Sequence, residues 1–72
     1  MLKISSDIED ILRLGGSISI DASKNISSNL LDFARLAKIS GAMIILRNAD
    51  KVITPTLKEI ARLVPGKVIF EL

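Results

Sequence analysis

A five-residue phrase occurs three times in this chain of 72 residues. It reads DILRL at residues 10–14, DFARL at 32–36 and EIARL at 59–63. Each copy is followed by a glycine, and these glycines, Gly16, Gly41 and Gly66, are 25 residues apart. Self-similarity at a period of about 20–50 residues is typical of proteins built from stacked repeats. The phrase therefore predicts three copies of one supersecondary unit that stack to share a core.

The residues around each copy indicate which elements the unit contains. Small polar residues precede the copies, and they are Ser5 and Ser6, Ser27 and Ser28, and Thr54 with Pro55. Ser and Thr are favoured at helix N-caps, and Pro is tolerated in the first turn. A glycine is where a helix commonly ends, and an apolar stretch follows each one: SISID, AMIILRN and KVIFEL. Each unit therefore reads as a capped helix, a glycine turn and a strand.

Strands that are joined by helices are expected to be parallel, with right-handed crossovers. The predicted fold class is α/β, with three helix–strand repeats forming a small parallel sheet that carries its helices on one face. The chain is expected to be a single domain over residues 1–72, with repeat units at about 4–23, 24–50 and 51–72. Residues 1–4 are predicted to add a partial strand at one edge of the sheet.

The stretch IILRNADKVITPTLKEIARL, from Ile44 to Leu63, resembles a leucine-rich repeat of the cysteine-containing subtype. In that family a strand of the form L-x-L leads through a turn to I-T and then to L-x-x-L-A on a helix. The preceding stretch, residues 18–36, is similar, although Ala49 stands where the subtype has its cysteine. The resemblance implies strands on one face, helices on the other, and binding of other proteins on the strand face.

The composition favours association with another chain. Hydrophobic residues make up 49% of the chain but aromatic residues only 3%, so the core lacks the large areas that aromatic rings bury. The chain has no cysteine, and this excludes disulfides. Domains of this size commonly need such additional stabilisation or oligomerisation. We therefore expect a homo-oligomer.

The middle strand leaves apolar side chains without a cover, because helices on one side protect only one face of a sheet. Met43, Ile44, Ile45 and Leu46 are apolar on both faces of this strand. The glycine spacing points Met43 and Ile45 at the helices, whereas the L-x-L likeness points Ile44 and Leu46 there. The alternative is that the monomer buries both faces. Self-association through the exposed sheet face or a strand edge is predicted to involve Met43, Ile44, Ile45, Arg47, Ile69, Glu71 and Leu72.

Catalytic and metal-binding chemistry is poorly represented. The chain has neither His nor Cys, which removes the commonest general base, thiol nucleophiles and most transition-metal ligands. Acidic and basic residues recur three apart as Asp10 with Arg13, Asp32 with Arg35, and Glu59 with Arg62, as expected for helix-surface ion pairs. Residues 21–25 resemble the start of a calcium loop, but Ile26 replaces the required glycine. We expect no enzyme, no cofactor and no bound metal.

The leading functional hypothesis is a non-enzymatic protein–protein interaction module that self-associates, and the alternative is a small nucleic-acid-associated protein. Its contacts are predicted to be a weak basic rim of Lys24, Arg47, Lys51 and Lys67, interrupted by Asp21, Asp50 and Glu71. Aromatic platforms for single strands are lacking. The longest apolar run, residues 42–46, is too short to span a bilayer. The first residues lack the pattern of a signal peptide, so a cytoplasmic location without membrane contact is expected.

Overall fold

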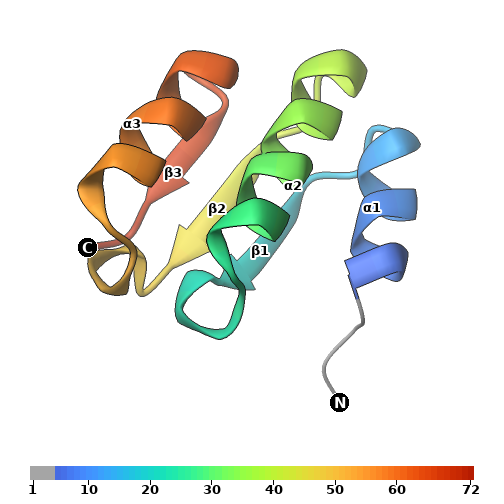
Figure 1. Ribbon diagram of the computed structural model, residues 1–72. Helices are drawn as coiled ribbons and strands as arrows, with labels where there is room; N and C mark the ends of the chain where they lie inside the picture. Colours follow the sequence, from blue (N-terminus) through green and yellow to red (C-terminus); the bar gives the residue numbers. More distant parts are fainter. Residues whose placement is uncertain (1–4) are drawn as a thin grey trace.

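The computed structural model describes residues 5–72, and within them helices and strands alternate as predicted (Figure 1). The helices are α1 (Ser5–Arg13), α2 (Ser27–Ser40) and α3 (Thr54–Leu63). The strands are β1 (Ile18–Asp21), β2 (Ile44–Arg47) and β3 (Val68–Phe70). Short 3-10 turns, η1 (Ala22–Lys24) and η2 (Ala49–Lys51), follow the first two strands. The partial strand predicted for residues 1–4 lies outside the described residues.

The three strands form one parallel sheet in the order β1-β2-β3. The helices lie side by side over one face of this sheet, α1 beside α2 and α2 beside α3 (Figure 1). The two layers give a flat molecule with principal extents of 29 × 28 × 18 Å. The α/β class, the parallel sheet and the placing of all helices on one face are thereby confirmed.

The core lies between the two layers and is almost entirely aliphatic. Phe33 is buried there together with residues of all three helices, β1 and β2, and Val68 and Phe70 of β3 are partly buried against them. Ala34 is fully buried in α2, where its small side chain lets neighbouring elements approach closely. The other fully buried large side chains are Leu12, Leu30, Ile44, Leu46, Ile60 and Val64.

Gly41 ends α2 as the sequence predicts, but Gly15 and not Gly16 is left-handed after α1, α3 is capped by Val64, and the N-terminal caps also differ. Gly41 ends α2 in the left-handed conformation, with φ +80°, and its N–H donates to the Ala37 carbonyl. The predicted caps Ser27 and Thr54 are instead the first helical residues, and Ile26 and Ile53 occupy the N-cap positions. The two residues after each 3-10 turn are extended, and α2 and α3 begin directly after them. Ser27 and Thr54 therefore lie one position inside the helices instead of before them.

We predict that Ile60→Val lowers the free energy of unfolding by about 0.5–1.5 kcal/mol, because it removes a buried methyl group and leaves a small cavity. Ile60 is 1% exposed. The measurement is urea unfolding followed by circular dichroism. Ile39→Val removes the same atoms at a position that is 84% exposed, and it should change the stability by less than about 0.5 kcal/mol. Equal effects of the two variants would contradict this placement of the core.

Candidate interaction face

Strand β2 separates its side chains sharply between the two faces of the sheet. Ile44 and Leu46 are 1% and 2% exposed, and they pack under the helices. Met43 is 37% exposed and Ile45 is half-buried on the opposite face. Of the two alternatives left open by the sequence, the one that places Ile44 and Leu46 inward is therefore found. Ile44 belongs to the core, which corrects its inclusion among the predicted interface residues.

The strand register aligns the outward side chains in three rows. The middle row is Ser19, Ile45 and Ile69, which are direct partners across the sheet. At the amino ends of the strands, backbone N–H groups of Ile18 and Ile44 donate to the carbonyls of Met43 and Lys67. These hydrogen bonds extend the register to a row of Ser17, Met43 and Lys67. At the carboxyl ends, the third row is Asp21, Arg47 and Glu71. We call these nine residues the outer sheet face.

The middle of the outer sheet face is apolar. Ile69 is 45% exposed and stands beside Ile45 in the register, and Met43 precedes Ile45 by two residues on the same side of β2. Their side chains share one face because successive residues of a strand alternate between faces. Strand β1 contributes serines to the same face. The apolar patch therefore lies over β2 and β3.

Charged residues occupy opposite ends of this face. The row at the carboxyl ends holds two carboxylates, Asp21 and Glu71, on either side of Arg47. Lys67 is exposed at the amino end of β3. The ion pairs within residues 5–72 all lie on the helices and on η2, and none includes Arg47, Lys67 or Glu71. These three charges are therefore free to interact with a partner.

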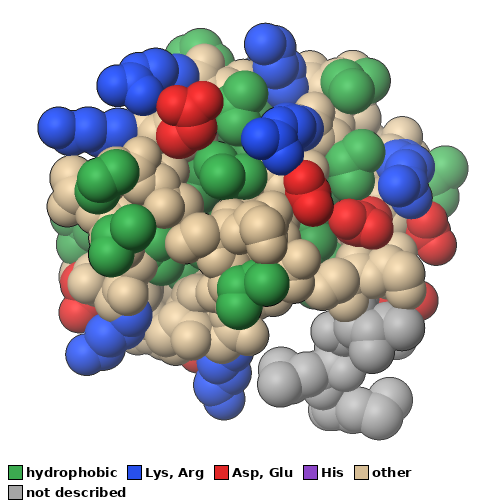
Figure 2. All heavy atoms as spheres, in the orientation of Figure 1, with side chains coloured by type: hydrophobic (Ala, Val, Ile, Leu, Met, Phe, Trp, Pro, Cys, Tyr) green, Lys and Arg blue, Asp and Glu red, His purple; other side chains and the backbone are tan. Residues whose placement is uncertain are grey.

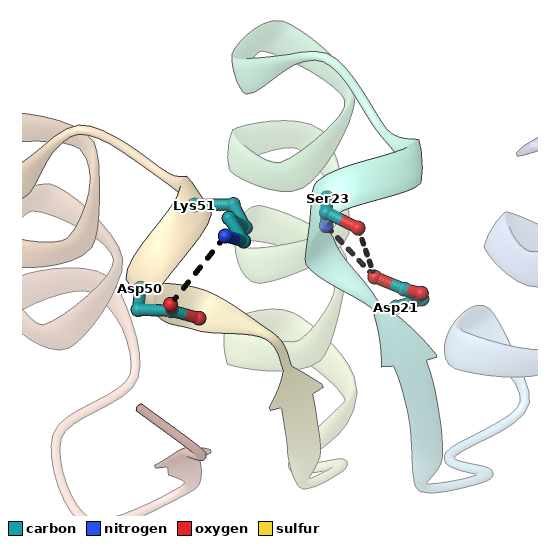
Figure 3. A network of polar contacts seen from close by, with 4 residues as sticks. All are labelled: Asp21, Ser23, Asp50 and Lys51. Carbon is teal, nitrogen blue, oxygen red and sulfur yellow. Dashed lines mark hydrogen bonds and ion pairs between the residues drawn. The ribbon is translucent and has the colours of Figure 1, made fainter.

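Asp21 is partly engaged in the turn that follows β1 (Figure 3). Its carboxylate accepts hydrogen bonds from the Ser23 hydroxyl and from the Ser23 backbone N–H, the latter at 3.0 Å. The Ser23 hydroxyl, with a smaller contribution from Asn48, lowers the pKa of the Asp21 carboxyl below its usual 3.8. Asp21 thus caps the 3-10 turn η1, so residues 21–25 form the turn that leads from β1 toward α2.

The three acidic–basic pairs of the repeated phrase are found on the helices. Arg13 with Asp10, Arg35 with Asp32 and Arg62 with Glu59 are joined at 2.9, 2.8 and 3.0 Å. All six side chains are exposed, so each pair stabilises its helix by only about 0.2–0.5 kcal/mol. Figure 2 shows the helix side of the molecule, where acidic and basic side chains are intermixed. This side offers no segregated patch of one charge.

The structure divides the predicted basic rim. Lys24 and Lys51 lie on the 3-10 turns at the carboxyl ends of the strands, and Lys51 is 4.0 Å from Asp50 (Figure 3). Lys67 precedes β3 and therefore lies at the amino ends of the strands, at the opposite end of the sheet from Lys24 and Lys51. Because all strands point the same way, these lysines cannot line one edge. The four predicted residues do not form a continuous rim.

Leu72, the last predicted interface residue, lies beyond the end of β3 and is 84% exposed. It is not in any of the three rows of the outer sheet face. Residues 5–72 contain no group of three or more acidic side chains arranged to hold a metal ion. None of the described helices is long and apolar enough to cross a membrane.

Comparisons with protein-family models, with curated proteins and with solved structures gave no match to this chain. The resemblance to leucine-rich repeats thus stays a prediction from the sequence.

We predict that Ser23→Ala raises the pKa of Asp21 toward 3.8, because it removes the strongest hydrogen bond to the carboxylate. A carboxyl whose pKa is lowered by folding stabilises the fold above its unfolded pKa, and this contribution is lost as the pH falls through the folded pKa. The variant should therefore show a smaller loss of stability below about pH 4. Carboxyl NMR titration measures the pKa, with Ser28→Ala on α2 as the control. An unchanged Asp21 pKa in Ser23→Ala would contradict the assignment.

Proposed function

We propose that this chain is a non-enzymatic protein–protein interaction module that associates with a second copy of itself through the outer sheet face. The observation that carries the proposal is the apolar patch of Met43, Ile45 and Ile69, aligned by the strand register and left uncovered by the helices. An exposed contiguous apolar patch with a polar rim is typical of an interaction site. A flat face of this kind suits the flat face of another sheet.

The size of the face sets the expected strength. Three strands about 4.8 Å apart, each with five residues about 3.3 Å long, form a patch roughly 15 Å on a side. The area of such a patch, roughly 15 Å by 15 Å, is well below the roughly 800 Å² that each partner buries in a standard interface. Burying each apolar side chain fully contributes about 1.5–3 kcal/mol, and these are already partly covered. We therefore expect a weak dimer, whose population depends on concentration in the micromolar range or above.

The helix side supports the choice of face by contrast. Its exposed apolar side chains, Ile11, Leu14 and Ile39, lie on or directly after α1 and α2, among intermixed charged residues, and Ile26 and Ile53 are exposed at the amino ends of α2 and α3. The outer sheet face instead brings its apolar residues together from adjacent strands. A second copy is a suitable occupant because the same face supplies both an apolar middle and charges of both signs.

We predict that Ile69→Glu abolishes or strongly weakens self-association, because it places two carboxylates in the apolar middle of the dimer. The expected result is a rise of at least about tenfold in the dimer dissociation constant. Analytical ultracentrifugation across a concentration series measures it, and circular dichroism checks the fold. The matched control is Ile39→Glu, the same substitution at an 84% exposed position on the helix side.

Other outcomes point elsewhere. A wild-type chain that stays monomeric up to millimolar concentration would contradict self-association. Dimers that survive in Ile69→Glu would place the contact at a strand edge instead of the outer sheet face. A shift of DNA or RNA in a gel that disappears at high salt would favour the nucleic-acid hypothesis, because phosphate contacts weaken steeply with ionic strength.

A further inference from the structure

We propose that two copies pack outer sheet face against outer sheet face about a two-fold axis. This axis lies between the two sheets and runs perpendicular to the strands. In this arrangement Glu71 of each copy faces Lys67 of the other. The inference rests on the proposed self-association and deepens it, because it assigns the symmetry of the dimer and the charge pairs that select it.

The charge on the outer sheet face has a direction. The row at the carboxyl ends, Asp21, Arg47 and Glu71, carries a net charge of −1 from two carboxylates and one guanidinium. The row at the amino ends contains Ser17, Met43 and Lys67, so its net charge is +1. A surface that is negative at one end and positive at the other complements itself when it is reversed. A two-fold interface requires such self-complementarity.

An axis perpendicular to the strands reverses the strand direction and keeps the strand order. Strand β3 then lies on β3 of the second copy, and the carboxyl-end row faces the amino-end row. The middle row faces itself, so Ile45 meets Ile45 and Ile69 meets Ile69. Glu71 faces Lys67 twice, once on each side of the axis, and Asp21 faces an uncharged serine. The usual twist of about 30° between packed sheets preserves this order over so small a patch.

An axis parallel to the strands gives an unfavourable pattern when the faces overlap fully. The carboxyl-end row then faces itself in the opposite strand order. Arg47 would meet Arg47 of the second copy, and Asp21 would meet Glu71. Juxtaposed like charges strongly disfavour an interface. The full parallel overlap is therefore excluded by its charges.

A sideways shift by one strand relieves that repulsion and creates one competing arrangement. Strand β2 would then lie on β3, and Arg47 would face Glu71 of the second copy. This arrangement leaves β1 uncovered, so about a third of a face that is already small stays exposed to water. The reversed arrangement covers all three strands and opposes no like charges. For this reason we favour it over the shifted one.

A charge swap tests the assignment. Lys67→Glu and Glu71→Lys should each raise the dimer dissociation constant about tenfold at low salt, because each opposes like charges twice. The double variant Lys67→Glu/Glu71→Lys restores both pairs and the net charge, so its dissociation constant should return to within about threefold of the wild type. Sedimentation measures all three. Lys58→Glu, on the exposed surface of α3, controls for the change of net charge and should leave the dissociation constant unchanged.

The outcomes separate this inference from the proposed function. A monomeric wild type contradicts both. A wild-type dimer that Glu71→Lys tightens contradicts the reversed arrangement, because Glu71 would then face Asp21. In the shifted arrangement Lys67→Glu/Glu71→Lys stays a weak dimer, whereas Arg47→Glu/Glu71→Arg recovers the affinity that Arg47→Glu alone loses. That pair of results would establish the shifted arrangement and overturn the inference.

A cross-link provides a readout that does not depend on charge. The chain has no cysteine, so Ser19→Cys carries the only thiol. In the reversed arrangement position 19 faces itself across sheets about 10 Å apart, within reach of a short bismaleimide, and a covalent dimer is expected. In the shifted arrangement β1 has no partner strand. Ser6→Cys, exposed on α1, is the control. A dimer by sedimentation that gives no more cross-link in Ser19→Cys than in Ser6→Cys would refute the assignment.

Discussion

The two-residue alternation of β2 is the constraint on which both the core and the outer sheet face depend. Ile44 and Leu46 fill the space beneath the helices, and Ala42 and Ala49 are buried just before and after the strand. A slip of one residue would exchange every side chain between the faces. Because the inward positions are occupied by side chains that fit the core, Met43, Ile45 and Arg47 must lie outward. The exposed apolar patch is therefore a consequence of the core register.

The element order and the helix-surface ion pairs were predictable because they depend on local spacing. The facing of β2 was not settled by the glycines, although these are evenly spaced. The chain takes two residues from Gly16 to the first strand residue and two from Gly66, but three from Gly41 to Ile44. The additional residue in the middle turn exchanges the faces of the sheet on which the side chains of the following strand lie, compared with a count from the glycine. Equal glycine spacing thus does not guarantee equal strand facing, whereas the L-x-L likeness predicts the observed facing of Ile44 and Leu46.

The caps and the basic rim fail for different reasons. Ser27 does not cap α2, because its hydroxyl instead accepts a hydrogen bond at 3.4 Å from the Thr56 hydroxyl and so links α2 to α3. Such a contact between units has no signature in a local sequence. The division of the rim was available from the sequence. Lys67 precedes a strand, whereas Lys24 and Lys51 follow strands, and parallel strands place these positions at opposite ends of the sheet. The parallel direction of the strands therefore separates Lys67 from Lys24 and Lys51.

Asn48 explains how the charged row stays aligned although the repeats differ in length. The chain runs 14 residues from Ile18 to Asp32 but 15 from Ile44 to Glu59, so the later unit has one residue more between its strand and its phrase. Asn48 takes up this residue in the left-handed conformation, at φ 55°, which Asn tolerates better than most residues. Ala49 is then buried like Ala22, and its N–H donates to the Glu71 carbonyl at 2.9 Å. Had the extra residue entered β2 instead, Arg47 would face the core. The left-handed turn after the strand therefore holds Arg47 between Asp21 and Glu71, and gives the outer sheet face its charged end.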